Sequence, residues 1–210
     1  MNFSPDTRFG GQAIGNEYFF ELTGGSMALD FVNTLDEREG RERELISDIS
    51  RLAQWAVQAG ALSAQQVEAA VKVSGEGSDL LLSDAKCLRE DLFHLFSCVV
   101  SGRKVSPDMM EAFNRWRKET CENSAIEFRD GAFVLTFGGA SPSLRSVLWK
   151  IVQDAESILL DPERVSRVRQ CQGHQCAWMF LDYSRQKNRR WCDMTVCGNR
   201  AKVKRFRAKS

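Results

Sequence analysis

The sequence contains no long apolar run, no export signal and no internal repeat. None of its stretches approaches the roughly 18 to 20 uninterrupted apolar residues that a membrane-spanning helix needs. Residues 1–11 lack the charged-then-apolar pattern of a signal peptide. A repeat of roughly 20 to 50 residues, which solenoids and propellers require, is also missing. We therefore expect a globular protein of the cytoplasm that has no membrane partner.

The common signatures of enzymes are absent too. We find no phosphate-binding P-loop, no dinucleotide-binding fingerprint and no nucleophile–histidine–acid triad. The composition, with 43% hydrophobic and 27% charged residues, is that of an ordinary globular protein and excludes a disordered or fibrous one. We therefore expect a folded chain that is not an enzyme.

An excess of charge of either sign is absent from the whole chain but not from its parts. The chain carries 29 Lys and Arg against 28 Asp and Glu, a formal net charge of +1. Residues 1–160 hold 16 basic and 24 acidic side chains, whereas residues 161–210 hold 13 basic and 4 acidic ones. Such an asymmetry is typical of a nucleic-acid-binding segment attached to a solvated body.

The hydrophobic periodicity predicts an α+β fold in which helices dominate residues 1–160. A short strand is expected at 18–22, and residues 1–16 are expected to be flexible. Residues 125–128 and 132–137 flank Asp130-Gly131 and predict a β-hairpin. The charged stretch 38–44 indicates a loop or a solvated helix face, and Asp161-Pro162 is the predicted domain boundary. Apolar spacings of three and four, together with capping residues, predict helices at 26–35, 48–59, 63–73, 79–100, from 106 onward and at 142–160.

Four of the seven cysteines lie in the basic segment with the spacing C-x4-C-x15-C-x4-C: Cys171, Cys176, Cys192 and Cys197. The reducing cytosol disfavours disulfides, and two close thiolate pairs can wrap one Zn²⁺ ion tetrahedrally. Four protein ligands leave no position for water, so we expect one structural zinc ion. His174 lies between the first two cysteines and could replace one of them, but a hydrogen-bonded or solvated loop histidine is the favoured interpretation.

The residues around the cysteine pairs predict a small basic finger. The apolar segment 177–182 predicts a strand against the zinc site, and Gly198-Asn199 opens a helix. Trp178 and Trp191 are expected in the core of the finger, with stacking on exposed bases as the alternative. Three apolar side chains of the helix are expected to pack toward the zinc and leave the cationic ones outside: Ala201, Val203 and Phe206.

These residues resemble the CGNR zinc finger family, which is named for the tetrapeptide found here at 197–200. The resemblance covers residues 166–210 and implies a small treble-clef-like finger, with the four cysteines as zinc ligands and DNA as the partner. Upstream, LDFVNTL at 29–35 and the helix carrying Leu52 and Trp55 resemble the ABATE domain of bacterial putative stress-induced transcription regulators. We therefore expect an ABATE-like α+β domain at 1–160, a CGNR zinc finger at 161–210 and a role in transcription regulation under stress.

The basic surface of the predicted finger is the candidate nucleic-acid interface. Ten basic residues between positions 185 and 209 face a single acid, Asp193, although a merely solvated surface would intersperse acids. A single finger buries too little surface for tight specificity, so a homodimer or a helper protein is expected. The residues expected to contact nucleic acid are Arg185, Lys187, Arg189, Arg190, Arg200, Lys202, Lys204, Arg205, Arg207 and Lys209.

Two rival hypotheses stay open. The finger could dock on RNA polymerase or another acidic protein, or the first domain could bind a small-molecule effector. Asp30, Asn33 and Thr34 could line a ligand pocket, although helix capping and satisfied buried hydrogen bonds explain them equally well. The other cysteines are Cys87, Cys98 and Cys121; the first two share nearly one helical face and could sense oxidants, although buried structural thiols are commoner.

Overall fold

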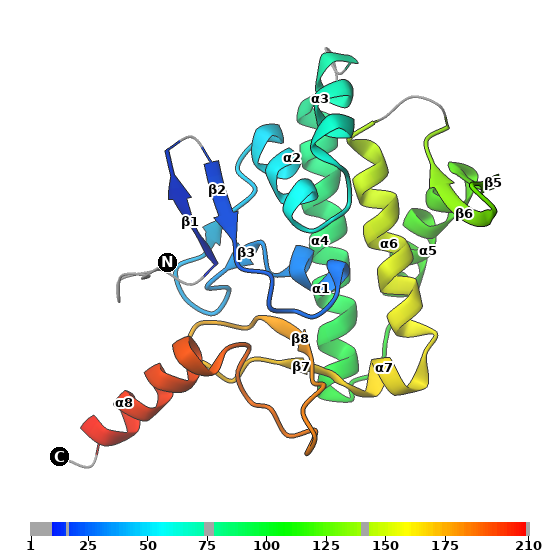
Figure 1. Cartoon of the computed structure of the whole chain (residues 1–210). Helices are drawn as coiled ribbons and strands as arrows, with labels where there is room; N and C mark the ends of the chain where they lie inside the picture. Colours follow the sequence, from blue (N-terminus) through cyan, green and yellow to red (C-terminus); the bar gives the residue numbers. More distant parts are fainter. Residues whose placement is uncertain (1–9, 16, 74–77, 140–142, 209–210) are drawn as a thin grey trace.

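A computed structural model of the chain describes residues 10–15, 17–73, 78–139 and 143–208 (Figure 1). The first half contains β1 (Gly11–Ile14), β2 (Glu17–Phe20), α1 (Met27–Val32), β3 (Leu35–Asp36), β4 (Arg43–Glu44), α2 (Ile49–Gln58), α3 (Ala64–Val73) and α4 (Ser78–Ser101). The second half contains α5 (Pro107–Glu122), β5 (Ser124–Arg129), β6 (Ala132–Phe137), α6 (Arg145–Leu159), α7 (Pro162–Ser166), β7 (Val168–Gln170), β8 (Met179–Leu181), a π-helical turn (Met194–Gly198) and α8 (Asn199–Arg207). The expected α+β architecture is confirmed.

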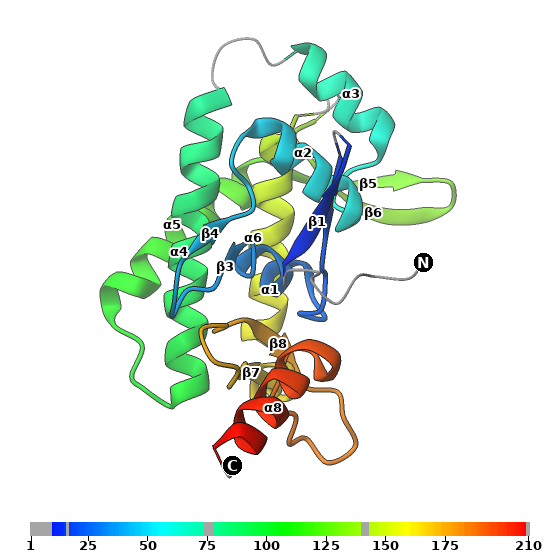
Figure 2. The same cartoon turned by 90° about the vertical axis from the view of Figure 1, so that its left-hand side faces the viewer.

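The body of the molecule is a layer of helices around α4 and α6, with the β7–β8 hairpin and α8 at one end (Figures 1 and 2). Apolar residues recur at spacings of three and four along α4, and their side chains are buried, including Leu88, Leu92 and Phe96. Trp55 on α2 packs against Phe31 on α1, with their ring centroids 5.2 Å apart. Burial of these side chains supplies the main favourable term for folding. Within the described residues, no helix has the length and apolar character needed to cross a membrane.

Several helices begin where their capping residues predict. The Ser26 hydroxyl accepts a hydrogen bond from the Leu29 N–H at the start of α1, and Ser106 caps α5 in the same way. Ser63 and Gln66 form the reciprocal capping box that opens α3. The predicted start of the last body helix at residue 142 lies outside the described residues, and α6 begins at Arg145.

The strands form antiparallel two-stranded pairs, and one of them matches the sequence closely. β5 pairs with β6 in the register Phe128↔Phe133, and Asp130 and Gly131 at the turn have φ of 51° and 82°. Positive φ at both central residues is what a tight type I′ hairpin requires, and Asp-Gly supplies it with little strain.

Two expectations for the first fifty residues are corrected. Part of the segment expected to be flexible, Gly11–Ile14, forms β1 and pairs with β2, while residues 1–9 and 16 lie outside the described residues. The charged stretch 38–44 is neither purely a loop nor a helix, because its end forms β4 and pairs with β3. Charge alone did not reveal this strand, since Arg43 pairs with Asp36 of β3 and Glu44 pairs with Arg89 of α4.

The finger shares one strand with the body. In β8 and the residue before it, alternate side chains point to opposite sides, as they must in a strand. Met179 and Leu181 enter the core of the body together with Val168 of β7, whereas Trp178 and Phe180 pack among the cysteines. The predicted boundary at 161–162 therefore divides the sequence into two segments, but side chains of the second segment pack in the core of the first.

Polar groups of the ABATE-like segment fix this strand in place. The side-chain amide of Asn33 accepts a hydrogen bond from the Met179 N–H at 2.8 Å and donates one to the Met179 carbonyl at 2.9 Å. The Gly24 carbonyl accepts from the Leu181 N–H at 2.8 Å. Since both partners of Asn33 are buried, a missing amide would leave a backbone donor and acceptor unpaired.

Asn33→Ala should therefore destabilise the whole protein. Leaving two buried backbone groups unsatisfied costs about 2–4 kcal/mol in the free energy of unfolding. Urea unfolding monitored by circular dichroism measures this cost, and the exposed Asn114→Ala is the matched control with an expected change below about 0.5 kcal/mol. Equal stabilities of the two variants would show that the Asn33–Met179 pair does not hold the strand.

Candidate metal centre and basic surface

Four cysteines from separate segments meet in one buried cluster. Cys171 follows β7 and Cys176 precedes β8. Cys192 ends the loop that follows β8, residues 182–192, which we call the basic loop, and Cys197 lies in the π-helical turn that leads into α8. All four are buried, and their sulfur atoms lie within 4.8 Å of one another. The Cys176 and Cys192 sulfurs are 3.6 Å apart, and those of Cys192 and Cys197 are 3.8 Å apart.

These distances fit a tetrahedral zinc ion. Four sulfurs at about 2.3 Å from a central Zn²⁺ lie about 3.8 Å from one another, which agrees with the 3.6 and 3.8 Å separations of the Cys176–Cys192 and Cys192–Cys197 pairs. The tight first turn, CQGHQC, needs its glycine, because a Cβ on Gly173 would lie 2.7 Å from the Cys197 sulfur. Gln175 and Ala177 have positive φ of 68° and 57°, so this turn is also conformationally strained. A bound metal ion gives a reason for both features.

The electrostatics of the cluster favour a cation. Hydrogen bonding to Cys176 lowers the pKa of Cys171, and the same contact raises the pKa of Cys176. Burial raises the pKa of Cys192. Without a metal, these three thiols therefore cannot all ionise, because buried like charges repel one another. A divalent cation removes that conflict and, with four protein ligands, leaves no open position for catalysis.

The surroundings of the cluster confirm two further predictions. His174 is exposed and lies outside the cluster, so the candidate ligands are the four cysteines alone. Trp178 is buried among the sulfurs and Trp191 packs half-buried against them. The alternative of base stacking therefore does not hold for Trp178, whose indole is enclosed.

The expected packing of α8 on the zinc site is wrong for most of the helix. Ala201 is half-buried, but Val203 is 49% and Phe206 75% exposed. The reason is geometric: after Cys197, α8 extends away from the body (Figure 1). Two apolar side chains therefore share the surface of α8 with its cations.

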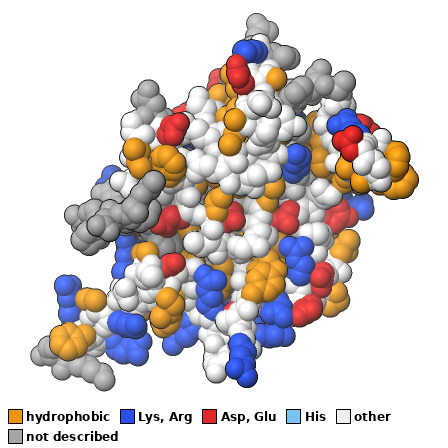
Figure 3. All heavy atoms as spheres, viewed as in Figure 1, with side chains coloured by type: hydrophobic (Ala, Val, Ile, Leu, Met, Phe, Trp, Pro, Cys, Tyr) orange, Lys and Arg blue, Asp and Glu red, His pale blue; other side chains and the backbone are white. Residues whose placement is uncertain are grey.

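The structure places most, but not all, of the predicted cationic residues at one end of the molecule and exposes them. Lys and Arg side chains crowd the end of the molecule formed by the finger and α8 (Figure 3). We define the basic surface as the seven exposed residues Arg185, Lys187, Arg200, Lys202, Lys204, Arg205 and Arg207. Lys209 lies outside the described residues.

Two arginines of the predicted set have structural contacts instead. Arg189 is half-buried, donates to the carbonyls of Trp191 and Cys192, and stacks over the Phe180 ring with 4.4 Å to its centroid. Arg190 is exposed but donates to the Gln172 side chain at 2.7 Å, which ties the basic loop to the first cysteine turn. Arg189 therefore braces the finger rather than facing a partner.

A hollow lies between the first cysteine turn and α8. Gln172, His174 and Gln175 line one side, and Arg200, Lys204 and Arg205 line the other. Arg190, Trp191 and the acidic Glu37 also line it. The sequence did not indicate the glutamines as part of this surface, because only the fold brings the CQGHQC turn opposite α8.

The polar residues of LDFVNTL hold the structure together rather than line a pocket. The Asn33 amide is used by β8, and the Asp30 carboxylate accepts a hydrogen bond from the Gly24 N–H at 2.7 Å. Thr34 donates to the Phe31 carbonyl at 2.7 Å and accepts from Arg89 at 3.1 Å. Internal hydrogen bonds therefore account for Asp30, Asn33 and Thr34, as the alternative to a ligand pocket predicts.

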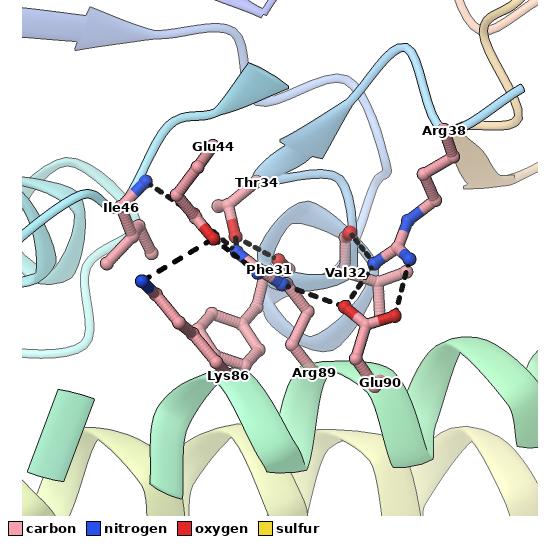
Figure 4. Close-up of polar contacts among 9 residues, drawn as sticks. All are labelled: Phe31, Val32, Thr34, Arg38, Glu44, Ile46, Lys86, Arg89 and Glu90. Carbon is pink, nitrogen blue, oxygen red and sulfur yellow. Dashed lines mark hydrogen bonds and ion pairs between the residues drawn. The ribbon is translucent and has the colours of Figure 1, made fainter. Parts of the chain in front are cut away.

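Thr34 belongs to a partly buried ion network that the sequence did not reveal (Figure 4). Arg89 on α4 donates to both carboxylate oxygens of Glu44 at 2.7 and 2.6 Å. Arg38 donates to both oxygens of Glu90 at 2.6 and 3.0 Å. These bidentate pairs attach the β3–β4 segment to α4, so Arg38 and Glu44 are held at its two ends while residues 39–42 between them are exposed.

The remaining cysteines do not form a pair. Cys98 is buried with its sulfur 3.8 Å from that of Met109, whereas Cys87 and Cys121 are exposed. The burial of Cys98 agrees with a structural thiol, and the exposure of Cys87 does not.

Two family models match the chain. The model described as CGNR zinc finger matches residues 167–210. The ABATE model, described as "Putative stress-induced transcription regulator", matches residues 25–162. No curated protein matches the chain.

Replacing Cys192 with Ser should abolish zinc binding. Wild-type protein should contain one zinc ion per chain, and the variant close to none, because three thiolates and a hydroxyl form a much weaker site. Metal analysis of purified protein measures this, and the exposed Cys121→Ser, which should retain one zinc, is the control. Full zinc content in Cys192→Ser would exclude the four-cysteine site.

Asp30 should make stability depend on pH. Burial raises the pKa of Asp30 to about 7, with a smaller rise from nearby Asp154, whereas the Gly24 hydrogen bond lowers it. Between the ordinary aspartate pKa and about 7, the folded state binds more protons than the unfolded one, so stability falls as pH rises through this window. Asp30→Asn keeps the acceptor for Gly24 and should lose this component.

The measurement is the difference in urea unfolding free energy between Asp30→Asn and wild type from pH 4.5 to 8. We expect the variant to gain stability relative to wild type as pH rises to about 7 and then to level off. A difference that stays constant across this range would contradict the raised pKa.

Proposed function

We propose that this chain, which belongs to the ABATE family and ends in a CGNR zinc finger, is a transcription regulator that binds duplex DNA through its basic surface. A regulatory, zinc-binding role follows from the two families. DNA as the partner is the further step, and the basic surface is the observation that carries it.

The cations of α8 support this proposal because nothing within the described residues neutralises them by an ion pair. Five of the nine residues of α8 are Lys or Arg and none is acidic. Elsewhere the body pairs its arginines, as Arg89 and Arg38 do in Figure 4. Unpaired cations in one place repel each other, and polyanion binding offsets that cost by releasing counterions from the DNA.

The shape of the finger suits a DNA groove. α8 projects from the body and has the width of an α-helix, about 10–12 Å, which fits the major groove of about 12 Å. Arg185 and Lys187 are exposed on the loop that follows β8, where they can add contacts to phosphates. The four thiolates fix the start of α8, so zinc would hold the cationic helix in one orientation.

A second candidate function is docking on an acidic protein such as RNA polymerase. The observation that favours it is the exposure of Phe206 and Val203 among the cations of α8, since apolar side chains in a basic frame suit a protein partner better than phosphates. An effector-binding first domain is less favoured, because Asp30, Asn33 and Thr34 are engaged in internal hydrogen bonds.

The test is duplex binding measured by fluorescence anisotropy over a range of salt concentrations. For wild type we expect affinity to fall steeply with salt, and Lys204→Gln/Arg205→Gln should lower the slope of log K against log[salt] by roughly 0.9 for each lost phosphate contact. Arg115→Gln/Lys118→Gln removes two exposed cations of α5 and is the matched control, with an unchanged slope expected.

The outcomes separate the two candidates. Weak affinity that both double variants reduce equally would indicate general electrostatics and contradict a specific basic surface. No duplex binding at low salt, together with binding to RNA polymerase that Phe206→Ala abolishes, would favour protein docking instead.

A further inference from the structure

The β5–β6 hairpin carries an apolar face that nothing in the described chain covers. The cross-strand pairs Ile126↔Leu135 and Phe128↔Phe133 place four large side chains on one face. Ile126 is 75%, Phe128 64%, Phe133 79% and Leu135 43% exposed. The hairpin stands out from the body, and Figure 3 shows hydrophobic atoms gathered on it. We call these four residues the hairpin face.

The opposite face of the hairpin is mixed, because Val134, which is 36% exposed, lies there among charged and polar side chains. Glu127 and Arg129 lie on the opposite face and pair with each other, and Thr136 donates to Glu127 at 2.8 Å. Asp130 is at the turn. The hairpin face itself therefore carries no charge, and an apolar partner could cover it without burying an unpaired ion.

The chemistry of the hairpin face limits the kind of partner. Nucleic acid is excluded because the face has no cation, and the single arginine of the hairpin is already paired with Glu127. A lipid surface would select Lys or Arg beside the apolar residues, and the strands offer only that one. An apolar protein surface of similar width is the remaining class.

We propose that the hairpin face is a homodimer interface in which two copies of the chain pack their hairpins face to face across a two-fold axis. A two-fold interface joins the same patch on both copies, so the patch must complement itself. Two apolar pairs on an uncharged surface meet this condition, because aromatic and aliphatic side chains interdigitate without any matching of charges. An isolated two-stranded hairpin is also only marginally stable in water, and such packing would stabilise it.

The available area sets the expected strength. At roughly 150–250 Å² for each aromatic side chain, the hairpin face offers on the order of 400–500 Å² of apolar surface per copy. A standard interface buries about 800 Å² per partner, so we expect a dimer of micromolar rather than nanomolar dissociation constant.

The position of the hairpin agrees with a role in assembly. The hairpin and α8 lie at well-separated places on the molecule in both views (Figures 1 and 2). Pairing through the hairpins therefore leaves both basic surfaces free. This inference does not depend on DNA binding, because it rests on the hairpin alone.

Sedimentation velocity of the zinc-loaded full chain over about 1–200 µM tests the proposal. Wild type should pass from monomer to dimer in this range, and Phe128→Glu/Phe133→Glu should raise the dissociation constant by at least about 30-fold. The matched control is Leu80→Glu/Leu160→Glu, which adds the same charge at two leucines that are 66% and 75% exposed outside the hairpin. The control should dimerise as wild type does.

Three results would overturn the proposal: a monomeric wild type up to 200 µM, a dimer that survives in Phe128→Glu/Phe133→Glu, or an equal loss in the control. Because the altered side chains lie outside the core of the body, both variants should keep the wild-type helix content, and circular dichroism checks this. If Glu proves to unfold the hairpin, Phe128→Ser/Phe133→Ser removes the same apolar surface without adding charge and should give the same monomer.

Discussion

The packing of four buried thiols around one point is the constraint on which the finger depends. The segment from Cys171 to Arg207 has few apolar side chains of its own, and two of those on α8 face solvent. Its cluster consists of the cysteines with Trp178, Phe180, Trp191 and Val196. A segment with so small a core needs an additional stabilising element, and a tetrahedral metal site supplies it. Bringing the four sulfurs together requires the strained backbone of the CQGHQC turn and the close approach of Gly173 to the Cys197 sulfur.

The finger is nevertheless not an independent appendage, because β8 serves two cores at once. This explains the composition of the ABATE-like stretch 29–36. Its apolar residues fill the core of the body, and its polar residues connect to other segments. Asn33 binds β8, Thr34 meets Arg89, and burial raises the pKa of Asp36 to about 6 against the lowering influence of Arg43 and of Trp178 in the finger. A substitution in this stretch would therefore also perturb the finger.

Much of this architecture could be predicted from the sequence, because helices, caps, the Asp130-Gly131 turn and the cysteine pairs depend on nearby residues. The features that the sequence did not reveal depend on residues that are distant in the sequence. Residues 39–42 are exposed as expected, but Arg38 and Glu44 also looked solvated, since their ion partners lie on α4, about 50 residues further along. Val203 and Phe206 looked buried, since periodicity reveals an apolar face but not whether anything covers it. Arg189 looked like a DNA contact, although its partners follow only from how the loop folds.

Hydrogen exchange measured by mass spectrometry on zinc-loaded and zinc-depleted protein tests the central claim most directly. If the metal holds the finger and its cationic helix on a body that is stable by itself, depletion should increase exchange at 171–178 and 192–207 by at least tenfold. Exchange in α4 should stay unchanged, because its contacts lie in the core of the body. Equal protection of α8 with and without zinc would contradict the account, since the orientation of the basic helix would then not depend on the four thiolates.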